Sequence, residues 1–430
     1  MGICFYKGQH AINASLLYNS NQISYPRKSS VELKKIDMQG RVIEKKILSF
    51  SNTEPILCIS SDLSCNISMW GSACTLPGLD PSGKHIKKCQ DLCFTYSNGQ
   101  STILGVFDGH GQNGELISDY CVKESKDIFI TSMKNFTDRP TELLITILET
   151  IYEKLKDPTS TINIENSGCS CTLALVHNNY IHLANLGDAR AVLGTFKETL
   201  SQISKTSAFI QEKDFLLEIS KRRSTILQNE PNSLQLTIDH STKNTKEMVR
   251  VLKSGGCLQQ NFNKYGNRCG PYYIWKNYSN KPGIPISRCI GYTCAEDIGI
   301  NSNPDVISEE ITMDDEFLVV ATKGVWDVMS NKDVVNFIAG YKDQAKKVEI
   351  NDSIINDVNV DNSCIARLLC EEARVRWLAL VENENCIIED ISCVILEFDC
   401  KSDRRTNAGI KMPMERVFTI DKGMKYSLLP

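Results

Sequence analysis

The sequence lacks the features that mark several large classes of protein. It has no run close to the ~20 apolar residues that a membrane-spanning helix needs, and no signal-peptide hydrophobic core at its start. Basic residues are not in excess either, because 48 Lys and Arg stand against 52 Asp and Glu, for a net charge of -4. This balance argues against a nucleic-acid partner. We therefore expect a cytoplasmic protein that binds no nucleic acid.

Paired cysteine motifs are also missing, although cysteine itself is abundant. The 18 cysteines are scattered singly, and Cys169-Ser170-Cys171 has no second pair that would complete a zinc site. In a chain without a signal peptide, such cysteines behave as reduced, buried, small apolar residues. The pattern argues against a disulfide framework.

What remains is the composition of a globular protein with an uneven distribution of apolar residues. Hydrophobic residues make up 41% and charged residues 23% of the 430 positions. Residues 1–69 are polar with little periodicity, and we expect an N-terminal extension that holds a short strand or two. We expect one domain over 70–400, with a polar surface insertion near 195–234 and a flexible tail over 401–430.

The first residues carry a candidate membrane anchor. Gly2 follows the initiator methionine and Cys4 lies two residues on, the combination used for myristoyl plus palmitoyl attachment, although Tyr6 stands where Ser or Thr is usual. Two acyl chains would give stable but peripheral attachment. The alternative is an ordinary unstructured start.

The stretch Leu104–Phe107 predicts a buried strand that ends on Asp108-Gly109-His110-Gly111. Glycines at such a tip let the backbone approach an ion or a phosphate closely, because no Cβ is in the way. The plain alternative is a tight Asp-Gly turn between a strand and a helix. Gly71 to Gly83 looks turn-rich, and Asn98-Gly99 predicts a hairpin before the strand.

Further along, apolar spacing predicts more helices and strands. The expected helices begin near Leu116, Leu143, Lys246 and Ser330 and span about 365–380, and the expected strands cover 169–177, 183–193, 317–322 and 391–398.

Several of these predicted strands begin or end on a carboxylate. These residues are Asp91, Asp108, Asp188, Asp327, and Glu389 with its neighbour Asp390. Carboxylates without companion His or Cys suit hard cations such as Mg²⁺ or Mn²⁺. Two such ions can activate a water and neutralise a phosphate under attack. Spacing alone leaves open whether the carboxylates converge or are separate surface groups.

Seven short blocks in order resemble the metal-dependent protein phosphatases of type 2C, the PPM family. The blocks are Gln90-Asp91, Val106 to Gly111, Asn185 to Arg190, Thr237 to His240, Ser287-Arg288, Ala321 to Asp327, and Glu389 to Ser392. The resemblance covers about 70–400. It implies an α+β fold, an α-β-β-α sandwich of two antiparallel sheets flanked by helices. It also implies phosphorylated Ser/Thr proteins as partners, Mn²⁺ or Mg²⁺ as cofactors with up to two or three ions, and a monomer.

The resemblance also assigns roles to individual residues. It makes Asp108 the carboxylate that bridges two metals, Gly109 a ligand through its carbonyl, and His110 the general acid for the leaving group. Asp91 would hold metal partly through water, beside Gln90 where many members have Glu.

Three further positions match metal carboxylates. Asp188 and Asp327 correspond to ligands of a weaker third ion, and Glu389 to the aspartate that closes the main site. The family's phosphate-binding arginine has no arginine counterpart, and Lys87 or Lys88 would serve as a point charge in its place.

The largest departure from the family pattern is Lys323. The family has Thr-Asp-Gly where this chain reads Thr322-Lys323-Gly324, and that aspartate is a direct metal ligand. A protonated ammonium has no lone pair for a metal. Tyr292, which stands where the family commonly has aspartate, is a second loss near the cleft. Lys323 is instead expected to be an internal counterion among Asp108, Glu389 and Asp327.

Three functional hypotheses follow. The first is a pseudophosphatase, with hydrolysis impaired or lost, that binds phosphoproteins or other partners. The second is an active Mn²⁺- or Mg²⁺-dependent Ser/Thr phosphatase with a rebuilt metal site. The third, more distant, is a lipid-anchored scaffold that works through the insertion at 195–234.

Overall fold

The structure, a computed structural model, describes most of the predicted domain and part of the segment before it. The described ranges are 30–36, 42–49, 57–62, 68–80, 88–196, 231–262, 266–276, 282–352, 364–380 and 388–399. Gly2, Cys4, Lys87, residues 197–230 of the predicted insertion and the predicted tail lie outside these ranges.

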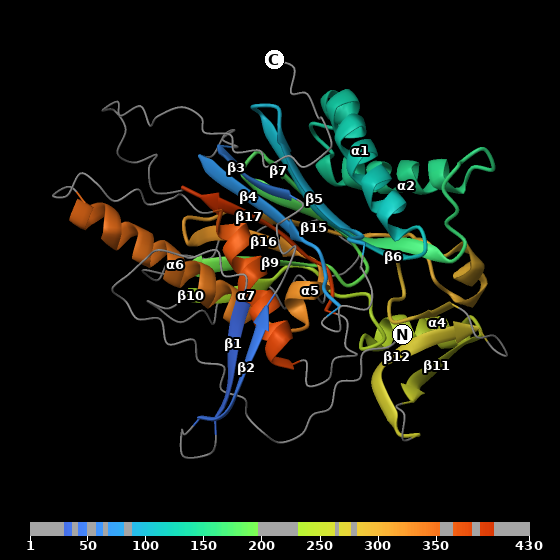
Figure 1. Ribbon diagram of the computed structural model, residues 1–430. Coiled ribbons are helices and arrows are strands. Elements are labelled where there is room, and N and C mark those ends of the chain that lie inside the picture. The colour runs from blue at the N-terminus through green and yellow to red at the C-terminus, as the bar shows by residue number, and fades with distance from the viewer. Residues whose placement is uncertain are drawn as a thin grey trace.

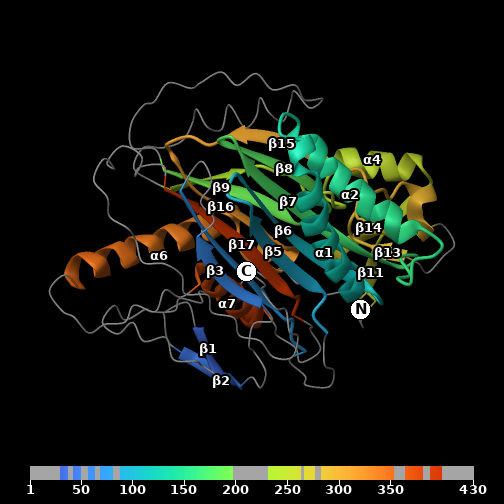
Figure 2. The ribbon, with the colours of Figure 1, turned by 90° about the horizontal axis from the view of Figure 1, so that it is seen from above.

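Two antiparallel sheets form the centre of the molecule (Figures 1 and 2). In spatial order, the first contains β15 (Asp305–Glu310), β8 (Tyr180–Leu186), β7 (Ser167–His177), β6 (Ser101–Gly111) and β5 (Asp91–Ser97), with β14 (Ile290–Gly291) paired to β7. The second contains β10 (Pro231–Gln235), β9 (Arg190–Phe196), β16 (Asp315–Ala321), β17 (Ile391–Phe398), β4 (Met69–Leu76) and β3 (Leu57–Asp62). β3 lies in the stretch predicted as an extension and is the outer strand of this sheet.

Helices cover the outer face of each sheet (Figure 2). The first sheet is covered by α1 (Gly114–Ser132) and α2 (Pro140–Lys156), with the 3-10 turn η1 (Met133–Asn135) between them. The second is covered by α5 (Lys323–Trp326), α6 (Asn331–Asp352) and α7 (Ile365–Leu380). This arrangement confirms the predicted α-β-β-α sandwich. None of the described helices is both long and apolar enough to span a bilayer.

A smaller unit lies beside the sandwich, at the lower right of Figure 1. It contains α4 (Thr245–Lys253), β11 (Gly256–Phe262), β12 (Arg268–Lys276), β13 (Pro282–Ile284) and the 3-10 turn η2 (Thr293–Ile298). Two further strands, β1 (Ser30–Ile36) and β2 (Val42–Ser49), pair only with each other among the described strands.

Strand alternation builds the core in layers, since successive side chains in a strand point to opposite faces. On β6, Leu104 and Val106 point into the core between the sheets, whereas Ile103 and Phe107 pack under α1 and α2. All four side chains are fully buried. The same alternation decides where the polar residues that follow will point.

Two expectations of turns are wrong. β6 ends on Gly111, within the stretch predicted for the strand end, and the alternative of a tight Asp-Gly turn fails because β7 continues to pair with β6 from Asp108 to Gly111. Gly71 to Leu76 is not a turn region but most of β4, which is held between β17 and β3. In both cases ladder partners from distant sequence override local turn chemistry. The predicted hairpin at Asn98-Gly99 is confirmed, with Gly99 in the left-handed region at φ 83°.

Candidate functional site

Two of the predicted carboxylates face each other across a pair of strands. Asp91 opens β5, Asp108 lies near the end of β6, and the two residues are direct register partners. Asp108 shares the alternation of Val106, and Asp91 that of Cys93, so both side chains lie on the face between the sheets. From the second sheet, Thr322 donates its hydroxyl to Asp91 Oδ2 at 2.7 Å.

Asp188 reaches the same end of the sandwich through the connection between β8 and β9, which joins the two sheets. Gly187 in this connection has φ 110°, and a Cβ there would collide with the side chain of Ser170. Only glycine therefore fits this crossing without movement. Ser170 Oγ donates to Asp188 Oδ1 at 3.3 Å, which ties the carboxylate to β7.

Glu389 and Asp390 come directly before β17. Asp390 is 6% exposed, and its carboxylate accepts backbone N–H groups from Gly78 and, at 3.0 Å, from Gln90. A Cβ at Gly324 would collide with the Asp390 carbonyl oxygen, so the start of α5 packs directly against the start of β17. This close approach brings Lys323 beside Glu389.

Lys323 is the cation of this acidic cluster, which we define as Asp91, Asp108, Asp188, Asp327 and Glu389. Its ammonium donates to Asp327 Oδ2 one helical turn further on, and it also interacts electrostatically with Asp108, Asp188 and Glu389. The Lys323 side chain remains 29% exposed. Within the described ranges, no three His, Cys, Asp or Glu side chains are arranged to hold one metal ion.

The pKa values in the cluster are shifted in the directions expected for several carboxylates close to one ammonium. Burial, followed by the charges of Asp91, Asp188 and Glu389, raises the pKa of Asp108 well above its usual value, and Lys323 opposes this. Burial also raises the pKa of Asp188 to about 6. Burial alone would lower the pKa of Lys323, but the surrounding carboxylates outweigh it and raise that pKa.

His110 lies on the same strand face as Asp108, at the end of β6. Both of its ring nitrogens are buried without a partner in the described part of the chain. Burial lowers the pKa of the imidazole to about 4, so the ring is neutral at pH 7. Its ring centroid lies 5.2 Å from that of Tyr292, a buried residue at φ 49°.

The remaining predicted residues have structural contacts of their own. Gly109 donates its backbone N–H to the Gln90 carbonyl at 3.1 Å, and the Gln90 amide reaches the Gly111 carbonyl at 2.7 Å. Lys88 lies on the surface with an 81% exposed side chain, 3.5 Å from Glu115 of α1. The other candidate phosphate ligand, Lys87, is outside the described residues.

Three polar residues at or beside the cluster stand in blocks that resemble the family but had no individual role in the sequence interpretation. Thr322 bonds to Asp91, and Arg190 forms a two-pronged pair with Asp239 at 3.0 and 2.6 Å. Strand alternation could have indicated Thr322, since it follows the inward-facing Val320 by two positions. The Arg190–Asp239 pair joins β9 to a distant loop, for which the local sequence carries no signal.

The raised pKa of Asp188 predicts that the stability of the metal-free protein depends on this residue. The folded pKa of about 6 exceeds the usual 3.8, so the folded state holds the proton more tightly and loses stability as pH rises from about 4 through 6. We expect Asp188→Asn to be more stable than wild type by roughly 2 kcal/mol at pH 7, and unchanged at pH 4. Urea unfolding in EDTA at both pH values measures this.

The control for this experiment is Asp138→Asn, a change at an exposed carboxylate before α2. It should leave the free energy of unfolding unchanged at both pH values. An Asp188→Asn variant that is less stable than wild type at pH 7 would contradict the prediction.

With this geometry in place, comparison with known proteins identifies relatives. Residues 82–208 and 223–373, more than half of the chain, match the family described as Protein phosphatase 2C. A "Probable protein phosphatase 2C 34" from Arabidopsis thaliana is 26% identical over 386 residues, which cover 85% of this chain and 89% of that protein. A "Probable protein phosphatase 2C 65" from the same organism is 28% identical over 276 residues, which cover 59% of this chain and 63% of that one.

A solved structure shares the fold. The "serine-threonine phosphatase 2C from Toxoplasma gondii" superposes with a TM-score of 0.55 at 17% identity, and the match covers 80% of this chain and 99% of that one. At this identity the likeness shows the arrangement of sheets and helices.

Proposed function

The chain belongs to the protein phosphatase 2C family, and from that premise we propose that it is a member with impaired or lost hydrolysis that binds phosphoproteins or other protein partners. The observation that carries the proposal is the position of Lys323. Its ammonium is bound to Asp327 and lies among the carboxylates that the family resemblance assigns to metal ions. The Lys323 ammonium, a permanent part of the chain, then takes the place of exchangeable metal ions.

The donor set does not fit two divalent ions of the kind that the family uses. The carboxylates of Asp91, Asp108, Asp188 and Glu389 are hard oxygen donors, but the Lys323 ammonium offers no lone pair and repels a second cation. Two unit charges about 4 Å apart interact by about 4 kcal/mol at an effective dielectric constant of 20. A repulsion of this size lowers metal affinity by orders of magnitude.

His110 supports the same proposal. A general acid must carry a proton that it can give to the leaving group. With a pKa of about 4, the imidazole is neutral at pH 7, and it makes no hydrogen bond to any described residue that would orient it. Tyr292 also covers one side of the ring. The protonated form that the resemblance assigns to His110 as general acid is therefore scarce at neutral pH.

One observation favours an active Mn²⁺- or Mg²⁺-dependent Ser/Thr phosphatase as the second candidate. The Lys323 side chain is 29% exposed, so it is not sealed inside the cluster. If it moved out, the carboxylates of Asp108, Asp188, Asp327 and Glu389 would remain as oxygen donors for an ion.

Calorimetry and turnover of the wild-type protein separate the two candidates. We expect no Mn²⁺ binding tighter than millimolar, because an ion must displace the ammonium from Asp327 and overcome its charge. We also expect no release of phosphate from a phosphoserine peptide in Mn²⁺. Micromolar Mn²⁺ binding together with metal-dependent turnover would favour the active enzyme and overturn the proposal.

A further inference from the structure

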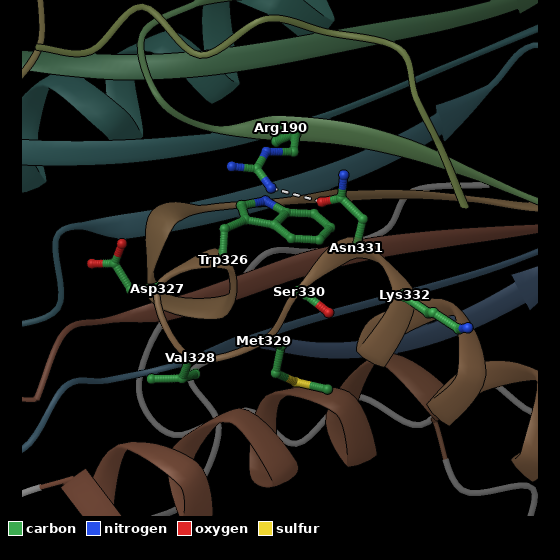
Figure 3. A pocket seen from close by; sticks show the side chains of 8 residues that line it. All are labelled: Arg190, Trp326, Asp327, Val328, Met329, Ser330, Asn331 and Lys332. Carbon is green, nitrogen blue, oxygen red and sulfur yellow. Dashed lines mark hydrogen bonds between the residues drawn. The ribbon is translucent and has the colours of Figure 1, made fainter. Parts of the chain in front are cut away.

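A hollow of about 580 Å³ opens beside the acidic cluster, where α5 ends and α6 begins. Its apolar lining includes the Trp326 ring and Met329, and its polar lining includes Arg190, Asp327, Ser330 and Lys332 (Figure 3). In Figure 3 the Asp327 and Lys332 side chains lie at opposite ends, with the Trp326 ring between them. The hollow therefore has an apolar middle and charged ends.

Arg190 and Trp326 form a fixed wall of this hollow. The Arg190 guanidinium lies 5.0 Å from the centre of the indole ring, and the indole Nε1 donates to the Ala321 carbonyl at 2.9 Å. Asp239 accepts from Nε and Nη2 of the guanidinium, and Asn331 accepts from Nη1 at 2.6 Å. Side chains fixed in this way lose little further entropy when a ligand binds.

The charges that line the hollow are not equally neutralised. Asp327 is bound to Lys323, and Arg190 is bound to Asp239. Lys332 is exposed and forms no ion pair within the described ranges. Its ammonium is the uncompensated charge in the lining, and Arg190 retains N–H groups beyond the three that are bonded. The hollow is therefore complementary to an anionic group with an apolar neighbour.

The acidic cluster cannot provide this recognition. Its carboxylates outnumber its one ammonium, so without bound metal it repels phosphate. We propose that the hollow docks a partner protein through the anionic side chain of a peptide segment, a phosphoserine or a carboxylate, at its Lys332 end. An apolar neighbour of that side chain packs on Trp326 and Met329. This inference rests on the proposed function, since it names the surface that binds the phosphoprotein.

The test is fluorescence polarisation in EDTA with labelled pentapeptides that carry leucine on both sides of a central residue. The central residue is phosphoserine, Glu, Ser or Arg. We expect the phosphoserine and Glu peptides to bind, and Lys332→Glu to weaken both by about tenfold or more through loss of a charge-assisted hydrogen bond. Lys332→Arg should retain binding.

The matched control is Lys134→Glu, the same charge change at an exposed lysine of η1 on the opposite helical layer. It should leave the affinity for both peptides unchanged. The inference is overturned if the wild type binds neither anionic peptide, or if Lys332→Glu binds them as tightly as the wild type does. It is also overturned if Lys134→Glu lowers the peptide affinity as much as Lys332→Glu does. A preference for the Arg peptide would overturn it too, because the ligand would then bind at Asp327.

The hydrolysis assay tests the proposed function separately from the docking inference. If the wild type hydrolyses the phosphoserine peptide in Mn²⁺, the pseudophosphatase proposal fails. The docking result is unaffected, because the binding assay contains no free metal and the Glu peptide cannot be hydrolysed.

Discussion

Replacing Lys323 with aspartate is expected to tighten Mn²⁺ binding by roughly a thousandfold and to produce measurable turnover of a phosphoserine peptide. The change removes a positive charge that the surrounding carboxylates hold in place, and it adds a hard oxygen donor at the start of α5. It also releases Asp327 from its ion pair. Two unit charges about 4 Å apart interact by about 4 kcal/mol at an effective dielectric constant of 20. A free-energy change of this size is enough for a thousandfold gain in Mn²⁺ affinity. Calorimetry and phosphate release measure the two effects.

Two neutral variants at the same position divide the effect into its causes. Lys323→Met removes the ammonium without adding a donor and should recover only part of the metal affinity. Lys323→Asn adds a neutral oxygen and should lie between Met and Asp. The charge control is Lys134→Asp, which should bind Mn²⁺ as weakly as the wild type does. If Lys323→Asp binds Mn²⁺ no better than Lys134→Asp, the ammonium is not what prevents binding.

Replacing Glu247 with alanine is expected to cost about 3 to 5 kcal/mol of unfolding free energy. Glu247 is 4% exposed and lies on α4, where its carboxylate accepts hydrogen bonds from Ser287, from Arg250, and from Nε and Nη2 of Arg288. Arg288 also pairs with Asp305 of β15 at 2.6 Å. Without Glu247, the Arg288 charge loses its most buried partner at the junction of the smaller unit and the sandwich. Urea unfolding at pH 7 measures the loss.

The effect of Glu247 should depend on pH. Burial would raise the pKa of this carboxyl, but Arg288 and Ser287 outweigh burial and lower it to about 2 from the usual 4.5. A lowered pKa contributes stability that is present above about 4.5 and is lost as pH falls through about 2. The difference between wild type and Glu247→Ala should therefore shrink in acid. Glu149→Ala, at an exposed position of α2, should cost less than about 0.5 kcal/mol. A cost for Glu247→Ala that is equal at pH 7 and pH 2 would contradict the prediction.

The sequence predicts the elements best where periodicity is strong and partners are local. The helix from Ile365 to Leu380 and the strand from Ile391 to Phe398 have the bounds that their patterns predict. β4 was missed because its Gly71, Ser72 and Ala73 carry little β-propensity of their own. Ser72 faces α7, where its Oγ accepts the backbone N–H of Ala366, whereas Ala73 points into the core between the sheets.

The site could be predicted as a set of carboxylates but not as an arrangement. Alternation along β5 and β6 is enough to place Asp91 and Asp108 on one face. The family resemblance adds Asp188, Asp327 and Glu389 as expected metal ligands. Other contacts in the site join residues more than two hundred positions apart. Thr322 donates to Asp91, and the Asp390 carboxylate accepts the backbone N–H groups of Gly78 and Gln90. Such pairs depend on how the two sheets stack, which local sequence does not encode.

The place of β17 in its sheet has a consequence for how the protein is made. β17 is the last described strand of the chain, yet it lies in the middle of the sheet between β16 and β4. Until residues 391–398 have left the ribosome, β4 and β16 each present an open edge with no partner on that side. The long loop that must close before β17 inserts makes this step slow. The second sheet, and the carboxylates that meet at its end, therefore assemble only after nearly all of the described chain has been synthesised, and until then the two open edges are exposed to aggregation.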